Sequence, residues 1–346
     1  MFLSQFEDSS PHEILRLLTY HPRGFDSSVL SESIYTKRRS RANIVHFKPP
    51  PTFATLGDLN AFPIELLNEI LRYSDLYTIS MFSLLNRQAR TIVHASLPYK
   101  HLLRHAPRAL VALIRTAGSH FTVDEVFHTL CSPACCICGN FGAFLWIPEC
   151  IRCCFLCLRK APELLPMGKS HAKAVFGLTK KALARVPIMI TLPGTYSLFD
   201  KQYSRPRHLL SRARALQVAI MTHGGEQGLA KYMESKLSHA EATFEQQPIA
   251  MRNSETVDDI TRFMATIPFP YYDPTSRKTH IGLACKGCET VFNSTKLVSA
   301  EQCCALADRR DQTYTEMGFF EHLEHCLEAQ DLWNAHRTVT GMGSKK

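Results

Sequence analysis

Residues 59–90 read LNAFPIELLNEILRYSDLYTISMFSLLNRQAR, and this stretch decides the fold class of the chain. Pro63 fits the first turn of a helix, where its missing N–H costs nothing. The apolar residues that follow recur at spacings of three and four and so line one helical face: Ile64, Leu67, Ile70 and Leu71. Ser74 and Asp75 can end this helix and cap the next one. We therefore predict a unit of three short helices in residues 56–104.

This three-helix unit carries more apolar surface than so few residues can bury among themselves. Its apolar face must therefore lie against something else. Some of these side chains are expected to pack on residues 105–130, where a further helical pattern follows. The others are expected to meet a partner protein.

The cysteines lie in two clusters farther along the chain. The sequence has 346 residues, of which 45% are hydrophobic, enough for packed cores. Eight of the 13 cysteines fall within residues 131–157 and five within residues 285–326. A disulfide scaffold would spread its cysteines through a short secreted chain, so two tight clusters indicate two local sites. The net charge of +9 suits a nucleic acid or an acidic protein as partner and favours neither.

The first cluster predicts a zinc site built from two CxxC turns. Two such turns joined by a short arm supply four sulfurs at about 2.3 Å around a tetrahedral Zn²⁺. The predicted ligands are Cys135, Cys138, Cys150 and Cys153. This choice leaves Cys154 and Cys157 to face the core of the helix that follows. These two cysteines also form a CxxC, so they remain an alternative second pair.

The second cluster predicts another zinc site, with Cys285 and Cys288 as its first pair of ligands. Downstream, His322 and Cys326 are four residues apart, so on a helix both can reach one metal ion. A 33-residue insertion separates the two pairs, and it contains Cys303-Cys304, which could substitute as ligands. His325 lies off this helical face and is not a predicted ligand.

Catalysis is not expected from either site. Four protein ligands fill a tetrahedral zinc site and leave no position for a reactive water. A zinc deaminase would need an H-x-E motif, whereas Thr129 and Leu130 follow His128. The sequence also contains no P-loop, no nucleophile elbow and no GxGxxG motif. We therefore expect a protein that is not an enzyme and that contains two structural Zn²⁺ ions.

The N-terminal residues predict an intracellular location. The opening MFLSQFEDSSPHEILRLL has no basic segment followed by an apolar one, so no secretory signal is expected. No apolar run is long enough to span a bilayer. Residues 1–55 are expected to form a disordered tail, and Lys37, Arg38, Arg39 and Arg41 make a basic patch in it. This patch is either a solvated charge run or a nuclear targeting signal, so the cytoplasm, the nucleus or both are expected.

The remaining regions complete a mainly α prediction with little β structure. Residues 105–200 should form a helical, Cys-rich module resembling a zinc ribbon, with FGAFLWIP as a short strand. Residues 201–270 should form a helical region, with a pair of helices broken at Gly224-Gly225. Residues 271–346 should form a C-terminal module with a Cys-Cys-His-Cys site and a disordered tail. The expected whole is three helices followed by an irregular α-rich region with two zinc-stapled modules.

The three-helix stretch resembles an F-box. The matching residues are Leu59, Phe62-Pro63, Glu65-Leu66-Leu67, Ile70-Leu71, Asp75-Leu76, Leu84-Leu85-Asn86-Arg87 and Arg90. Phe62 stands where the family usually has Leu, and Ala89 lies near the place of its usual aromatic residue. Three later segments are similar to those of one group of fungal F-box proteins: Cys150–Leu158, Leu192–Tyr196 and Gly318–Cys326.

The resemblance implies a substrate-recognition adaptor of a cullin-RING ubiquitin ligase. An F-box docks on a Skp-type adaptor subunit, and the rest of the chain holds a protein substrate, which the sequence does not identify. The docking residues carried over are Leu59, Phe62, Pro63, Ile64, Glu65, Leu67, Ile70, Leu71 and Leu76. The alternative is a zinc-dependent nucleic-acid-binding or regulatory protein. It is disfavoured because no helix follows a zinc-finger motif at the usual spacing.

Overall fold

The structure is a computed structural model, and it describes residues 10–22, 25, 29–30, 55–196, 201–244, 261–295 and 299–340. It is mainly helical, at 59% helix against 15% strand, as predicted. The strands are short, with two to four residues each. Among the described residues, no helix combines the length and the apolar character that a membrane crossing requires.

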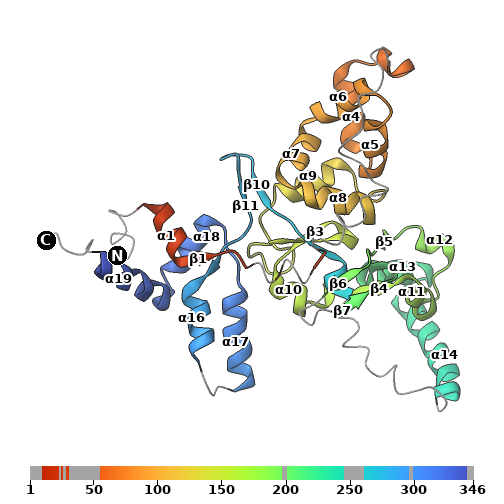
Figure 1. Ribbon diagram of the computed structural model, residues 1–346. Helices are drawn as coiled ribbons and strands as arrows, with labels where there is room; N and C mark the ends of the chain where they lie inside the picture. The colour runs from red at the N-terminus through yellow and green to blue at the C-terminus, as the bar shows by residue number, and fades with distance from the viewer. Residues whose placement is uncertain are drawn as a thin grey trace.

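The three predicted helices are present and lie at one end of the molecule (Figure 1). They follow a short 3₁₀ turn, η2 (Gly57–Ala61), and are α4 (Ile64–Tyr73), α5 (Leu76–Ser83) and α6 (Arg87–Ala95). Polar caps set where the second and third helices begin. The Asp75 carboxylate accepts from the amide of Thr78 at 2.8 Å, and Asn86 Oδ1 accepts from the amide of Ala89 at 2.8 Å.

Three more helices continue the unit without a break. They are α7 (Leu97–His105), α8 (Pro107–Thr116) and α9 (Val123–Leu130). Leu76 and Val93 share one buried cluster with Leu102 and Leu113. In addition, the Arg72 guanidinium pairs with the Asp124 carboxylate at 2.7 Å. The predicted boundary at residue 104 therefore runs through a continuous core.

A small antiparallel sheet forms the centre of the molecule. Its strand order is β3-β2-β9, with β2 at Phe144–Trp146, β3 at Ile151–Cys153 and β9 at Thr266–Pro268. A 3₁₀ turn, η3 (Ile147–Glu149), joins β2 to β3, and α10 (Phe155–Lys160) follows β3. The strand expected in FGAFLWIP is β2. The region predicted to be helical up to residue 270 instead supplies β9.

Arg152, on β3, connects this sheet to three adjacent segments through hydrogen bonds. Its side chain is 3% exposed and donates to the carbonyl oxygens of Gly142 at 2.6 Å, Pro270 at 2.7 Å and Thr129 at 3.0 Å. These acceptors belong to the first Cys-rich loop, the segment after β9 and the end of α9. One buried cation thus satisfies carbonyl groups from three segments that are distant in sequence.

A second core lies beside the sheet. Its three-stranded sheet has the order β4-β8-β5, with β4 at Pro166–Gly168, β5 at Met189–Ile190 and β8 at His208–Ser211. The helices α11 (Lys169–Phe176), α12 (Lys180–Leu183), α13 (Arg212–Thr222) and α14 (Glu226–Phe244) complete this core. The turn η4 (Pro162–Leu164) and the hairpin of β6 (Gly194–Tyr196) and β7 (Lys201–Tyr203) pack instead on the central core. The predicted helix pair broken at Gly224-Gly225 is confirmed. The predicted boundary at residue 200 is wrong, because the β4-β8-β5 sheet crosses it.

The C-terminal module is a cluster of helices (Figure 1, blue). A hairpin of β10 (Tyr271–Asp273) and β11 (Lys278–His280) leads into it. The module contains β12 (Ala284–Cys285), α16 (Lys286–Ser294), α17 (Ala300–Asp311), α18 (Glu316–Leu323) and α19 (Leu327–Thr340). The helices α16 and α19 pack closely together.

The N-terminal segment belongs to this C-terminal module, so the predicted disordered tail is wrong for the part that the structure describes. Helix α1 (Pro11–Leu18) places Ile14 and Leu18 in the same buried cluster as Cys285 and Trp333. Strand β1 (Thr19–Tyr20) pairs antiparallel with β12. The predicted basic patch at residues 37–41 lies outside the described residues.

Candidate metal centres

The first cluster brings together the sulfurs of Cys135, Cys138, Cys154 and Cys157, all within 4.8 Å of one another. The Sγ atoms of Cys138 and Cys154 are 3.7 Å apart. Zn–S bonds of about 2.3 Å in a tetrahedron place sulfur atoms about 3.8 Å apart. The four thiols therefore fit around one Zn²⁺ ion.

Two backbone turns aim these four thiols at one point. On the first, Gly139 N donates to Cys135 O at 3.0 Å, and Gly139 adopts φ +77°, a conformation that favours glycine. On the second, Cys154 caps α10, and its Sγ accepts from the amide of Cys157 at 3.4 Å. A helix N-terminus favours negative charge, which a thiolate ligand carries.

The predicted second pair of ligands, Cys150 and Cys153, is not in this cluster. Cys153 is the last residue of β3, pairs with Phe144 across the sheet and is completely buried. Cys150 lies in the tight turn before β3 with φ +54° and is also buried. The helix begins at Phe155, so the cap and first turn of that helix fall on Cys154 and Cys157. The alternative pair is the one that the fold brings to the site.

The thiols of the first cluster influence one another strongly. Hydrogen bonds from the Cys136 and Cys154 thiols hold the pKa of Cys135 well below its usual range. The hydrogen bond to Cys135, together with burial, raises the pKa of Cys154. Burial raises the pKa of Cys157 to about 12. One thiolate thus makes its neighbours hard to ionise, and a divalent cation would relieve that repulsion.

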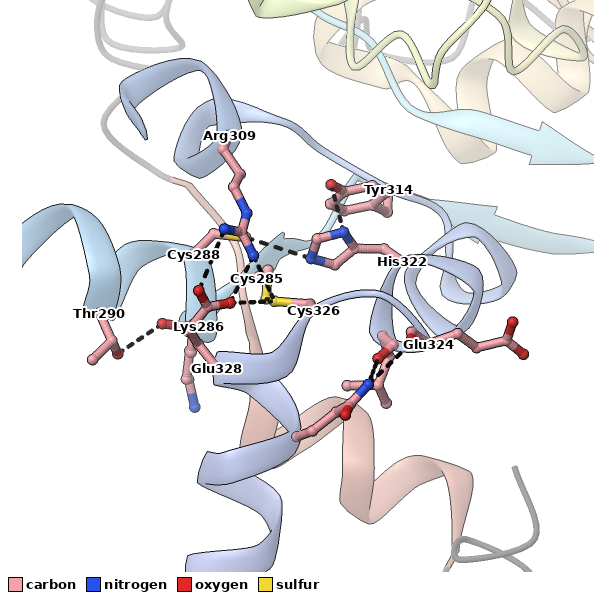
Figure 2. Close-up of polar contacts among 12 residues, drawn as sticks. Cys285, Lys286, Cys288, Thr290, Arg309, Tyr314, His322, Glu324, Cys326 and Glu328 are labelled. Carbon is pink, nitrogen blue, oxygen red and sulfur yellow. Dashed lines mark hydrogen bonds and ion pairs between the residues drawn. The ribbon is translucent and has the colours of Figure 1, made fainter. Parts of the chain in front are cut away.

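The second cluster contains the four predicted ligands, Cys285, Cys288, His322 and Cys326 (Figure 2). Cys326 Sγ lies 3.8 Å from Cys285 Sγ and 3.8 Å from Cys288 Sγ. His322 Nε2 lies 3.5 Å from Cys288 Sγ. Because a Zn–N bond of about 2.0–2.1 Å is shorter than a Zn–S bond, a nitrogen–sulfur separation slightly below 3.8 Å is expected in a tetrahedral site.

Tyr314 fixes which nitrogen of His322 faces the metal position. The Tyr314 hydroxyl lies 3.1 Å from His322 Nδ1, and the two rings are stacked. This leaves Nε2 to point at the sulfurs. Burial opposes a proton on His322, but hydrogen bonds to the Cys285 and Cys326 sulfurs outweigh it and raise the pKa of His322 to about 9. Metal binding would therefore displace a proton from this imidazole.

Arg309 supplies a positive charge beside the second cluster. Its guanidinium donates to Cys326 Sγ at 3.4 Å and pairs with the Glu328 carboxylate at 2.7 Å (Figure 2). Three thiolates and a neutral imidazole around Zn²⁺ carry a net charge of −1, which this cation partly compensates. The sequence did not single out Arg309 or Tyr314, because neither residue stands at a ligand spacing.

The other candidate ligands lie outside both clusters. Cys303 and Cys304 are exposed on α17. His325 is exposed as well, in agreement with its exclusion from the predicted ligand set. Among the described residues, these two clusters are the groups that could hold a metal ion.

The predicted docking residues of the three-helix unit divide into two sets. Leu67, Leu71 and Leu76 are buried inside this chain, so they belong to its own core and not to a free surface. Pro63 and Glu65 are exposed, and Leu59 is half-buried. Several large apolar side chains are about half exposed or more: Phe62, Ile64, Leu66, Ile70, Tyr73, Tyr77, Met81 and Leu85. The predicted docking set did not include Leu66, Tyr73, Tyr77, Met81 or Leu85.

An apolar pocket of about 140 Å³ opens within the same unit. Its walls come from the turn before α4 and from α4, α5 and α6, with Leu59, Ile70 and Phe82 among the lining residues. A pocket of this volume has room for an apolar side chain of about the size of benzene from a partner.

Comparison with known proteins gives no guide to the function. No protein-family model, no curated protein and no solved structure matches the chain. The function is therefore argued from the two clusters and from the apolar face.

Proposed function

We propose that the protein is a non-catalytic substrate-recognition adaptor of a cullin-RING ubiquitin ligase, with a Skp-type protein as its docking partner and two structural Zn²⁺ ions. The observation that supports this proposal is the apolar face of α4–α6. Ile64 and Ile70 are 48% and 51% exposed, and both lie on α4. Soluble monomers rarely leave such side chains grouped on a surface, and a grouped apolar patch is typical of a protein interface.

The position of the unit also supports docking. The helices α4, α5 and α6 form the far end of the molecule, away from the blue C-terminal helices and the green second core (Figure 1). A partner on this face would not displace either metal centre. The 140 Å³ pocket beside Ile70 would take an apolar anchor from that partner, and buried anchors of this kind contribute most of the binding free energy in many interfaces.

The metal centres support a structural role for zinc. Each cluster offers four side-chain donors, so a tetrahedral ion would have all its positions filled by the protein. The first centre joins the Cys135 turn to the start of α10. The second joins α16 to α18 and the segment that follows it. Zn²⁺ would therefore hold these segments of the chain together.

The proposal is tested by titrating a purified Skp-type protein onto the zinc-loaded chain, with isothermal calorimetry as the readout. We expect saturable 1:1 binding that weakens at least tenfold in the Ile64→Ala/Ile70→Ala variant. Met221→Ala is the matched control, because Met221 is 63% exposed on α13, in a different part of the molecule. Absence of binding by the wild-type chain, or equal binding by the double variant, would contradict the proposal.

A further inference from the structure

A groove of about 660 Å³ runs between the two candidate metal centres. One wall comes from the first Cys-rich loop, with Gly139 and Phe141, and from Tyr271 on the β10–β11 hairpin. The other wall comes from residues 312–325, around the start of α18. A volume of this size matches the clefts that bind small molecules and peptide side chains.

Each wall includes a residue of a metal cluster or one directly next to it. Gly139 directly follows the Cys138 ligand, and His322, a ligand of the second cluster, itself lines the groove. Tyr314 also lines it and is fixed by its hydrogen bond to His322. The groove is therefore shaped before a ligand arrives, which lowers the entropic cost of binding.

Two carboxylates line the groove, together with the imidazoles of His280, His322 and His325. As a zinc ligand, His322 is neutral. The carboxylates are those of Asp273 and Glu321, and no Lys or Arg is among the lining residues of the groove. The Asp273 carboxylate accepts hydrogen bonds from the amide and hydroxyl of Ser276 and from the amide of Thr275, which lower its pKa and keep it ionised. The Glu321 side chain is exposed and has no ion-pair partner among the described residues.

Three aromatic residues line the same groove. They are Phe141, Tyr271 and Tyr314. Tyr271 is braced by stacking on His280, with ring centroids 5.6 Å apart. An arginine or lysine side chain suits such a surface on both counts, because its cation is attracted to ring faces as well as to carboxylates.

We infer that the groove binds a protein segment through an arginine or lysine side chain, held between the aromatic rings and next to Glu321 and Asp273. As the substrate site of an adaptor, this inference deepens the proposed function and rests on it. The binding itself is a property of this chain alone. A basic side chain at an acidic groove is chosen over an acidic or apolar one because the groove lacks any permanent cation of its own.

The test uses the zinc-loaded full-length chain, immobilised, and pools of nonapeptides. Each pool has random flanks and one fixed central residue: Arg, Lys, Leu, Phe, Glu or Ser. We expect the Arg and Lys pools to be retained at least fivefold more than the Leu and Glu pools. Glu321→Gln should lower this preference to less than twofold. Glu324→Gln is the matched control, because Glu324 is exposed three residues farther along and does not line the groove.

A second variant, together with the zinc content, distinguishes a loss of binding from a loss of the fold. Tyr271→Leu removes the ring and keeps an apolar side chain, and the zinc content of each variant is measured alongside. We expect a loss of Arg retention with two Zn²⁺ ions still bound. A preference for the Glu, Leu or Phe pools, no preference at all, or an Arg preference that survives Glu321→Gln would each overturn the inference. The docking test with a Skp-type protein uses a different face, so its result is read separately.

Discussion

The Tyr314 hydroxyl lies 3.1 Å from His322 Nδ1, and the two rings stack with centroids 4.6 Å apart. When Nε2 faces the metal position, the Nδ1–H group donates a hydrogen bond to the Tyr314 oxygen. Tyr314 thus orients the His322 ring so that Nε2 faces the metal position. The same tyrosine lines the groove, so it connects the second metal centre with the proposed peptide site.

Replacement of this tyrosine should weaken the second metal centre alone. Tyr314→Phe keeps the stacked ring and removes the hydroxyl, so His322 loses the partner that orients it. We expect the zinc affinity of the second site to fall about tenfold, measured by competition with a chromogenic chelator. The affinity of the first site serves as the internal control. An unchanged second affinity would mean that the stacked ring alone orients His322.

The ligands of the first centre can be distinguished by a matched pair of substitutions. Cys154→Ala removes the thiol that caps α10, so we expect the zinc content to fall from two ions per chain to one. Cys150→Ala removes a buried thiol that is outside the cluster, so two ions should remain. The measurement is elemental analysis by mass spectrometry on the purified variants. Loss of zinc from Cys150→Ala, with Cys154→Ala fully loaded, would restore the pairing that the sequence first favoured.

The sequence predicts the clusters but does not determine whether Cys150 or Cys154 is a ligand. The Cys and His spacing indicated the two clusters that could hold a metal ion, and the apolar spacing together with Asp75 indicated the helices α4 and α5. The choice between two overlapping CxxC pairs depends on the residue at which α10 begins. A shift of four residues in that start exchanges the ligands for the core residues. No local pattern fixes it, because β3 is positioned by β2 and β9, and β9 is more than 100 residues away.

The N-terminal helix was missed for a related reason. The apolar residues of α1 cover only eight residues, which is too short to distinguish a helix from an irregular tail. Its partners, Cys285 and Trp333, are more than 250 residues away in the sequence. Contacts at this distance leave no trace in local periodicity, so the segment acquires its structure only from tertiary packing.

The docked N-terminal segment should stabilise the second metal module. Ile14→Ala or Leu18→Ala leaves a cavity beside Cys285 and Trp333, which costs about 2–5 kcal/mol for each substitution. We expect faster hydrogen–deuterium exchange in α16 and α19, whereas exchange in α5 stays unchanged. His12→Ala, at an exposed position of the same helix, is the control. Equal exchange in all three variants would show that α1 does not support the module.

The packing of α7 against the β10–β11 hairpin should weaken at acidic pH, because two stacked imidazoles, His101 and His105, lie at this contact. The His105 ring stacks on Tyr272 at a centroid distance of 4.2 Å, and the His101 ring lies tilted against Tyr272 at 4.7 Å. In addition, His105 Nδ1 contacts the Thr279 hydroxyl at 2.7 Å. Burial first, and then neighbouring cations such as Arg104, lower the pKa of both imidazoles. The folded state therefore favours their neutral forms.

Because the folded state lowers the pKa values of His101 and His105, acid should weaken this contact. The contribution to stability is complete above the unfolded-state pKa of about 6.5 and is lost as the pH falls through the lower folded-state values. We expect the β10–β11 amides to lose protection from hydrogen exchange between pH 7.5 and pH 5.5, after correction for intrinsic rates. In the His101→Phe/His105→Phe variant, which keeps the rings but cannot titrate, this loss should disappear. An equal loss in both proteins would place the acid sensitivity elsewhere.

Arg152 should contribute more to stability than any surface ion pair, because its removal leaves buried carbonyl groups without donors. Arg152→Met strips donors from the carbonyls of Gly142, Thr129 and Pro270, and each unsatisfied group costs about 1–3 kcal/mol. We expect the free energy of unfolding in urea to fall by at least about 3 kcal/mol.

Arg159→Met is the matched control for Arg152→Met, since Arg159 is partly exposed and its partner Asp311 keeps a second partner in Arg310. The control should change stability by less than about 1 kcal/mol. Similar losses in the two variants would mean that water or a shifted backbone satisfies those carbonyls, and that the sheet does not depend on this one cation.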